Sequence, residues 1–478
     1  MAKTLSNIEE IMNNPCHIHF VGIGGISMSG LAEILLDKGY SVSGSDSRSS
    51  PVTERLESLG ANITYGHYAE NITDDISYLV YTAAVKADNP ELITAKEKGI
   101  TVMSRAVLLG QIMSKYPTAV SVSGTHGKTT TTSMLAEILL EARYDPTILV
   151  GGILKSIHGN VRVGKSGYLV TEACEYTNSF HSFISTIDII LNIREDHMDF
   201  FKDIHDIRNS FKVFADKLDE SGVLVINSEI NDLSYFTNDL KCRYVTFGQD
   251  KNKSEFYPEN ITYNQFACAS FDIMKQTVCF DNGVCRFTNP VKTAHVDLKV
   301  PGEHNVLNAL AAFAAADIMN VPPEAAARGL NAYSGTDRRF QYKGERNGVT
   351  IIDDYAHHPD EIRATLTAAA NYPHRKLWCV FQPHTYTRTK AFLTQFASAL
   401  SLADEVVLAE IYPARETDTL GISSRTLCEE IEKLGKSVHY LPSFEEIEKF
   451  LLKNCINGDL LITMGAGDVV LIGENLLK

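Results

Sequence analysis

The sequence predicts an α/β protein of about three domains. Its 478 residues exceed what one hydrophobic core usually serves, and domains of roughly 100–200 residues make three the simplest division. Short apolar segments rich in β-branched residues alternate with amphipathic segments, a pattern typical of parallel strands covered by helices. Two of the apolar segments lead directly into glycine-rich loops, as strands that precede a bound phosphate do.

The first predicted domain spans residues 1–115. A strand (HIHFV) enters a glycine-rich loop and an amphipathic helix, and a second strand ends at Asp46. Gly22, Gly24 and this acid match a dinucleotide fingerprint, but Ser27 replaces its third glycine. The segment is therefore compatible with a bound pyrophosphate, with NAD, or with a turn that binds no ligand. Strand and helix signals continue until a Tyr-Pro pair interrupts the pattern.

The second predicted domain, residues 116–333, opens with a strand, the loop GTHGK and a helix. Glycines let the backbone approach an anion closely, and the amides at a helix start favour negative charge. Lys128 can reach the β- and γ-phosphates of a nucleotide, and the hydroxyl of Thr129 can ligate Mg²⁺. The loop is shorter than the common phosphate loop, because Val122 stands where that loop has its first glycine. We expect phosphate contacts from Gly124, Thr125, His126, Gly127, Lys128, Thr129 and Thr130.

Two later strands of this domain also end in polar residues. The strand SGYLV runs into Glu172, and an acid at that position suits a metal held against ATP. The strand IDIILNI leads to His197, whose imidazole can ligate a divalent ion or cap a helix. Lys212 follows on a helix, where a solvated positive charge is the simplest interpretation.

The segment PGEHNVLNALAA opens an alanine-rich helix with polar residues. An asparagine offers a donor and an acceptor together, which matches the N6/N7 edge of adenine. His304 and Asn308 are four residues apart and share one helix face. Helix capping is the alternative interpretation of both residues.

The third predicted domain, residues 334–478, places polar clusters after two consecutive strands, in VTIIDDYAHHP and KLWCVFQPHTYTR. The carboxyl edge of a parallel sheet is where open α/β sheets bind ligands. The pair of clusters therefore predicts a ligand site in this domain. Its candidate residues are Asp354, Tyr355, His357, His384 and Arg388.

The composition limits the classes of partner that the chain is expected to bind. The formal net charge of −15 argues against a general nucleic-acid or anionic-membrane surface, because both need basic patches. Nine cysteines without a C-x-x-C pair indicate reduced thiols, and the polar segment MAKTLSNIEEIMNN lacks the apolar core of a signal peptide. No apolar run reaches bilayer length. We therefore expect a cytoplasmic protein that binds neither nucleic acid nor membrane.

Taken together, the motifs resemble the Mur ligase family over essentially the whole chain. The most specific motifs are GIGGISMSG, GTHGKTTTT, EACEY, NIREDHMD, GEHNVLNALAA, RRF, DDYAHHP, QPHTYTRT and MGAGD. The resemblance implies a Rossmann-like UDP-sugar domain, a central P-loop ATPase-like domain and a Rossmann-like amino-acid domain. It implies an ATP- and Mg²⁺-dependent amide ligase, monomeric or homodimeric, in peptidoglycan precursor synthesis. The histidine of GTHGK, with DDYAHHP, favours L-alanine and UDP-N-acetylmuramate as substrates, joined through an acyl phosphate.

The resemblance also implies roles for individual residues. The UDP-sugar would contact Gly24, Gly25, Ser27, Met28, Ser29 and Asp46. Mg²⁺ would be held by Thr129, Glu172 and His197. Adenine would meet His304 and Asn308, and the ribose would lie near Asp354. Alanine would be bound by Tyr355, His357, His384 and Arg388. Catalysis would involve Lys128, Arg338, His357 and Lys212, the last at a position that is carbamylated in sibling ligases.

Three alternatives remain open on the sequence alone. A related ligase of the Mur or folylpolyglutamate type would add another amino acid. A nucleotide-operated switch would use the same phosphate loop, although it would not need the polar clusters of the third domain. An NAD oxidoreductase would rest on the first glycine loop alone.

Overall fold

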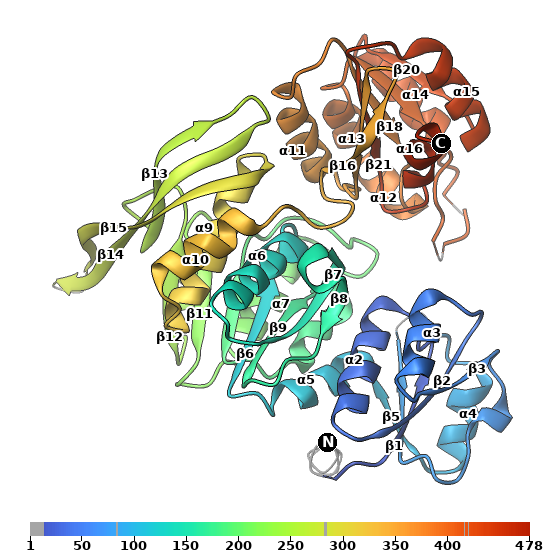
Figure 1. Cartoon of the computed structure of the whole chain (residues 1–478), viewed down its shortest axis with the longest axis vertical. Helices are drawn as coiled ribbons and strands as arrows, with labels where there is room; N and C mark the ends of the chain where they lie inside the picture. Colours follow the sequence, from blue (N-terminus) through green and yellow to red (C-terminus); the bar gives the residue numbers. More distant parts are fainter. Residues whose placement is uncertain (1–13, 83–84, 282–283, 415, 419) are drawn as a thin grey trace.

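The computed structural model describes residues 14–82, 85–281, 284–414, 416–418 and 420–478. Three separate sheets, each accompanied by helices, follow one another along the chain (Figure 1). This arrangement confirms the predicted three-domain α/β architecture. The polar N-terminal segment 1–13 lies outside the described residues.

The first sheet has five parallel strands in the order β3-β2-β1-β4-β5. Its strands are β1 (His17–Val21), β2 (Ser41–Asp46), β3 (Asn62–Tyr65), β4 (Tyr78–Tyr81) and β5 (Thr101–Ser104). Its helices are α2 (Ile26–Asp37), α3 (Pro51–Ser58), α4 (Pro90–Glu97) and α5 (Arg105–Met113). The strand order reverses beside β1, so the first glycine loop, between β1 and α2, lies where such sheets bind ligands.

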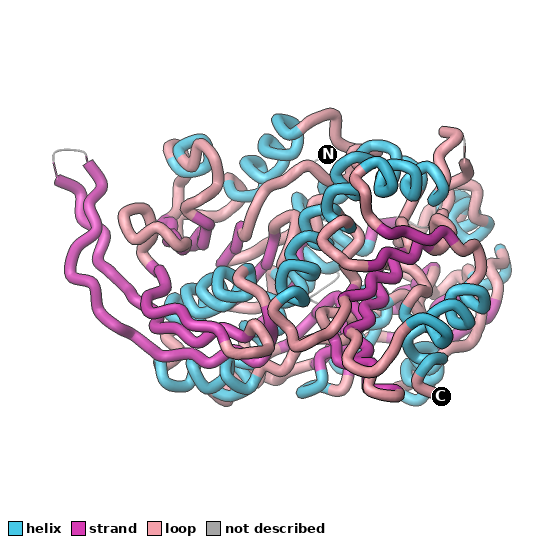
Figure 2. Tube along the Cα trace, turned by 90° about the horizontal axis from the view of Figure 1, so that it is seen from above, coloured by secondary structure: helices cyan, strands magenta, loops and turns pink. Residues whose placement is uncertain are grey.

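The central sheet has ten strands in the order β15-β14-β13-β12-β11-β10-β6-β9-β7-β8. Its parallel strands are β6 (Thr118–Ser123), β7 (Thr147–Leu154), β9 (Tyr168–Ala173), β10 (Ile187–Ile190), β11 (Val223–Asn227), β12 (Arg243–Phe247) and β13 (Phe256–Tyr263). Antiparallel pairing adds β8 (Gly159–Arg162), β14 (Cys268–Asp281) and β15 (Val284–Pro301). Figure 2 shows the β14–β15 hairpin projecting from the rest of the chain.

The helices of this domain place the phosphate loop beside the start of α9, the helix that carries Asn305 and Asn308. The helices are α6 (Lys128–Glu141), α7 (Ile204–Ala215), α8 (Ser234–Thr237), α9 (His304–Ile318) and α10 (Pro323–Ala332). Buried aliphatic residues of α6 and α9 share one hydrophobic cluster with the central strands. A 3₁₀ segment, η3 (Tyr176–Ser182), follows β9.

The third sheet has six strands in the order β16-β17-β21-β18-β19-β20, with only β16 antiparallel. Its strands are β16 (Gln341–Arg346), β17 (Val349–Asp354), β18 (Leu377–Phe381), β19 (Glu405–Leu408), β20 (Ser437–Tyr440) and β21 (Leu460–Met464). Its helices are α11 (Pro359–Ala370), α12 (Tyr386–Ala391), α13 (Leu393–Leu400), α14 (Ser424–Lys433), α15 (Phe444–Asn454) and α16 (Val470–Leu476). The polar clusters predicted at strand ends follow β17 and β18, at the same edge of the sheet.

The first domain packs on the central domain through α2. A methyl group added to Gly30 would lie 2.8 Å from Cγ2 of Val161, and Nδ2 of Asn160 donates to the carbonyl of Ile26 at 2.9 Å. This contact holds the first glycine loop toward the central domain.

Seven cysteines have described side chains, and all are free thiols. Among the described helices, none combines the length and apolar character that a bilayer crossing requires.

Candidate active site

The loop between β6 and α6 has the geometry of an anion site. Gly124 and Gly127 have φ of +139° and +87°, a backbone region that residues other than glycine rarely occupy. A methyl group on Gly127 would lie 2.6 Å from Oδ1 of Asn308. No side chain caps the start of α6 at Gly127, so the first amides of the helix remain available to an anion.

Lys128 is folded back onto this loop. Its Nζ donates to the carbonyl of Gly124 at 2.6 Å, to that of Thr125 at 3.0 Å and to Oε2 of Glu175 at 3.0 Å. Burial alone would lower the pKa of Lys128, but the carboxylates of Glu175 and Glu172 outweigh it and raise the pKa. Glu175 is buried and was not predicted as a functional residue, although it is the second acid of the motif EACEY.

A cavity of about 900 Å³ opens beside the loop. Its size suits a nucleotide, since small-molecule sites typically measure about 300–1,000 Å³. Segments from two domains line it, so the phosphate loop and the third domain face one ligand volume. Residues predicted to bind the nucleotide that line this cavity are His126, Gly127, Thr130, His304, Asn308 and Asp354.

The asparagines at the start of α9 form a buried chain. Nδ2 of Asn308 donates to Oδ1 of Asn305 at 3.0 Å, and Nδ2 of Asn305 donates to the carbonyl of Pro301 at 2.7 Å. Asn305 therefore orients Asn308 toward the cavity, a contact that the spacing of the two residues along the helix does not reveal. Burial lowers the pKa of His304 to about 4, so its imidazole is neutral at pH 7.

Asp354 ends β17 at the edge of the cavity. Its carboxylate accepts hydrogen bonds from the amides of Phe340 at 2.8 Å and Ala356 at 2.7 Å. Asp354 therefore also holds the linker, the segment 334–340 that leads into β16 of the third domain. Burial raises the pKa of Asp354 to about 6. Each carboxylate oxygen keeps a lone pair for a further donor such as a ribose hydroxyl.

The two arginines of the linker have different partners. Nε of Arg338 donates to Asp353 at 3.0 Å and its Nη2 to the carbonyl of Gly465 at 2.7 Å, so its guanidinium is engaged within the third domain. Nη2 of Arg339 lies 3.4 Å from Oγ1 of Thr129, and Arg339 lines the cavity. The geometry therefore favours Arg339 over the predicted Arg338 as the arginine that meets the nucleotide phosphates.

Oxygen donors suited to Mg²⁺ lie beside the loop. Glu172 is the penultimate residue of β9, and its carboxylate lies against Gly151, where an added methyl group would lie 2.9 Å from both carboxylate oxygens. Thr129 is the second residue of α6. These hard oxygens fit a magnesium ion held against phosphates. The ring of His197 lies 4.6 Å from that of Tyr176 between centroids, so its role as a metal ligand stays a prediction.

The predicted amino-acid residues meet the central domain at one interface. His357 and His384 lie with their rings 5.8 Å apart, and Nη2 of Arg388 donates to Oδ1 of Asp196 at 2.9 Å across the domain boundary. Burial opposes ionisation of Asp196, but Arg388 outweighs it and lowers the pKa of that carboxyl. The ring of Tyr355 lies under the Arg338 guanidinium, 5.0 Å from centroid to Cζ.

The first glycine loop is organised by its own acid. Oδ2 of Asp46 accepts the amide of Gly24 at 2.8 Å, so Asp46 shapes the loop. Met28 is 2% exposed and belongs to the core, which leaves only its backbone for a ligand. The hydroxyl of Ser29 donates to the carbonyl of Ile26 at 3.0 Å. Gly25 and Ser27 are exposed residues at the start of α2, and no side chain caps this helix.

Lys212 lies on α7 and pairs with Asp216 one helical turn later. The Lys212 side chain is 14% exposed, so it is not the solvated charge of the simplest interpretation. Its catalytic role and its carbamylation stay predictions.

Three family models match consecutive parts of the chain. They are described as "Mur ligase family, catalytic domain" for residues 17–117, "Mur ligase middle domain" for 122–316 and "Mur ligase, glutamate ligase domain" for 338–467. Together they cover most of the sequence.

Individual relatives agree with this assignment. The UDP-N-acetylmuramate–L-alanine ligase of Lachnospira eligens is 58% identical over 98% of this chain and 99% of that protein. The same-named ligase of Acetivibrio thermocellus is 50% identical over 97% of this chain and 96% of that protein. The crystal structure of UDP-N-acetylmuramate-alanine ligase MurC from Thermotoga maritima superposes with a TM-score of 0.78 at 31% identity, covering 97% of this chain and 98% of that one.

Proposed function

Because the chain belongs to the Mur ligase family, we propose that it joins L-alanine to the carboxylate of UDP-N-acetylmuramate at the expense of ATP, a step in peptidoglycan precursor synthesis. The observation that supports this choice most directly is the near full-length 58% identity to the L. eligens ligase of that name. The free thiols suit a cytoplasmic location.

The reaction requires activation of an unreactive acid. A carboxylate is a poor electrophile, so an oxygen of the sugar carboxylate attacks the γ-phosphorus of ATP, forming an acyl phosphate and releasing ADP. The neutral amine of alanine then attacks the acyl carbon, inorganic phosphate leaves with the carboxylate oxygen, and one proton is lost from nitrogen. Arg339 lines the cavity and would face the charge that spreads over the transferring phosphoryl group, which is where most catalysis of this step lies. Lys128 would join it by exchanging its contacts with the loop carbonyls for phosphate oxygens.

Mg²⁺ belongs to this proposal as an ion held by the chain's own oxygens. Thr129 and Glu172 would hold it, and when bound it would neutralise phosphate charge. His197 would lie on the sugar side of the site, next to Asp196. The donor set fits the ion, because both named ligands offer hard oxygens.

Water must stay away from the acyl phosphate until the amine arrives. The third domain serves this purpose, because Arg388 and His358 reach Asp196 and the carbonyl of Glu195 in the central domain at 2.9 and 3.0 Å. Burial lowers the pKa of His357 to about 3, so this histidine is neutral at pH 7 and suited to orient the amine. So low a pKa makes it a weak proton acceptor.

Phosphate release tests the proposal. We expect ATP hydrolysis to phosphate to require both UDP-N-acetylmuramate and L-alanine, with one amide formed for each phosphate. Release that is indifferent to both substrates would favour the nucleotide switch. Faster turnover with another amino acid would favour a sibling ligase, and tight NADH binding would favour the oxidoreductase.

A further inference from the structure

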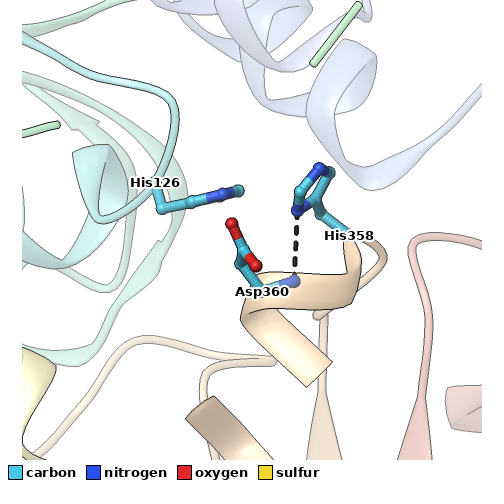
Figure 3. Close-up of side chains that lie close together, drawn as sticks. All are labelled: His126, His358 and Asp360. Atoms are coloured by element: carbon cyan, nitrogen blue, oxygen red, sulfur yellow. Dashed lines mark hydrogen bonds between the residues drawn. The ribbon is translucent and has the colours of Figure 1, made fainter. Parts of the chain in front are cut away.

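We propose that the chain binds a zinc-class divalent cation across the boundary between its second and third domains. The ligands are His126 from the phosphate loop and His358 and Asp360 from the start of α11. Their ligand atoms lie within 4.8 Å of one another. Figure 3 shows the ring of His126 extending toward His358, with the carboxylate of Asp360 beside it.

His126 has one nitrogen free for a metal. Its Nδ1 lies 3.1 Å from Oε1 of Glu361, and because a carboxylate only accepts, Nδ1 carries the proton. Nε2 then presents a lone pair, and this atom is buried without a hydrogen-bond partner among the described residues. An unpartnered buried nitrogen costs free energy, which a bound cation would recover.

His358 is held in the complementary tautomer. Its Nε2 donates to the carbonyl of Glu195 at 3.0 Å, so the lone pair is on Nδ1. Nδ1 accepts the amide of Asp360 at 3.2 Å as the N-cap of α11, so a bound ion would take this lone pair over from the amide. Both histidines therefore direct their second nitrogen to a carboxylate or a carbonyl, the arrangement that orients metal-bound imidazoles in proteins.

The donor set selects the class of ion. Two imidazoles and one carboxylate suit Zn²⁺ and its neighbours, whereas Mg²⁺ prefers oxygen alone. Bonds of about 2.1 Å in tetrahedral geometry separate ligands by about 3.4 Å, so small side-chain rotations would close the observed spacing. Because the ligands come from two domains, the bound ion would fasten the third domain to the phosphate loop. All three ligands also line the cavity assigned to the nucleotide, so the ion would share this cavity with ATP, and the binding test below uses the protein without nucleotide.

Cobalt binding tests the site without an activity assay. Co²⁺ titrated into the metal-free full-length protein should give the visible absorption of a low-symmetry site with one ion per chain, and Zn²⁺ should displace it. Zn²⁺ should also raise the melting temperature. His358→Asn and Asp360→Asn should each abolish the spectrum, and Glu361→Gln should weaken binding about 10–100-fold through its effect on His126.

Controls separate this site from others. His205→Asn removes an exposed histidine on α7 and should leave the titration unchanged. Because Asp360 is exposed, Asp360→Asn keeps the test valid if His358→Asn fails to fold. A spectrum that persists in Asp360→Asn, that disappears in His205→Asn, or that never forms in the unmodified protein would overturn the inference.

Discussion

We expect the neighbouring residues Arg338 and Arg339 to have different roles, the first in stability and the second in catalysis. Arg339→Ala should lower kcat about 10²–10³-fold, the usual loss when one donor to a developing charge is removed, with little change in stability. Arg338→Ala should instead lower the free energy of unfolding by about 1–3 kcal/mol, because Asp353 is buried and loses its partner. Steady-state kinetics and urea unfolding of both variants check this, and the reverse pattern would show the assignment to be wrong.

Lys128 should matter for both turnover and stability. Lys128→Ala should abolish turnover in a folded protein, since no other ammonium contacts the loop carbonyls in the described structure. It should also lower the melting temperature, because Glu175 would stay buried without its counter-charge. Adding Glu175→Gln should restore the melting temperature and leave turnover absent. Substantial kcat in Lys128→Ala would contradict the phosphate-site assignment.

The phosphate loop between β6 and α6 packs against α9. Gly127→Ala would place a methyl group 2.6 Å from Oδ1 of Asn308 in a left-handed backbone conformation, at a strain of about 1–2 kcal/mol. We expect a lower kcat/KM for ATP. Gly60→Ala is the matched control, because Gly60 has φ of +104° and open space around it. Equal losses of kcat/KM in the two variants would argue against a specific role for this turn.

At the scale of the molecule, buried neutral histidines make stability depend on pH. Burial lowers the pKa of His304 and His384 to about 4 and of His357 to about 3, against about 6.5 in an unfolded chain. Between these values the unfolded state binds more protons, so stability should fall as the pH drops from about 6.5 toward 4. Asp188 and Asp354, whose pKa values burial raises to about 8 and about 6, oppose this in part. Melting temperatures measured from pH 7.5 to 4.5 check the sign, and a rise toward acid would contradict it.

The order of the domains and the phosphate loop could be predicted because each depends on local signals. The alternating strand and helix patterns predicted the three α/β domains, and the motif around Lys128 predicted the phosphate loop. The choice between Arg338 and Arg339 could not be predicted, since adjacent linker residues turn to opposite sides only once Asp353 and Thr129 are in place. The roles of residues that act across domain boundaries, such as Glu361, depend on tertiary contacts that no spacing reveals.

In the proposed reaction, the terminal phosphoryl group of ATP activates the sugar acid at the cavity between the phosphate loop and the third domain. Turnover of UDP-N-acetylmuramate labelled with ¹⁸O in its carboxylate tests this most directly, with mass analysis of the released phosphate. We expect one labelled oxygen to pass into each phosphate, because the carboxylate oxygen leaves with the phosphoryl group. Unlabelled phosphate formed together with the amide product would contradict it.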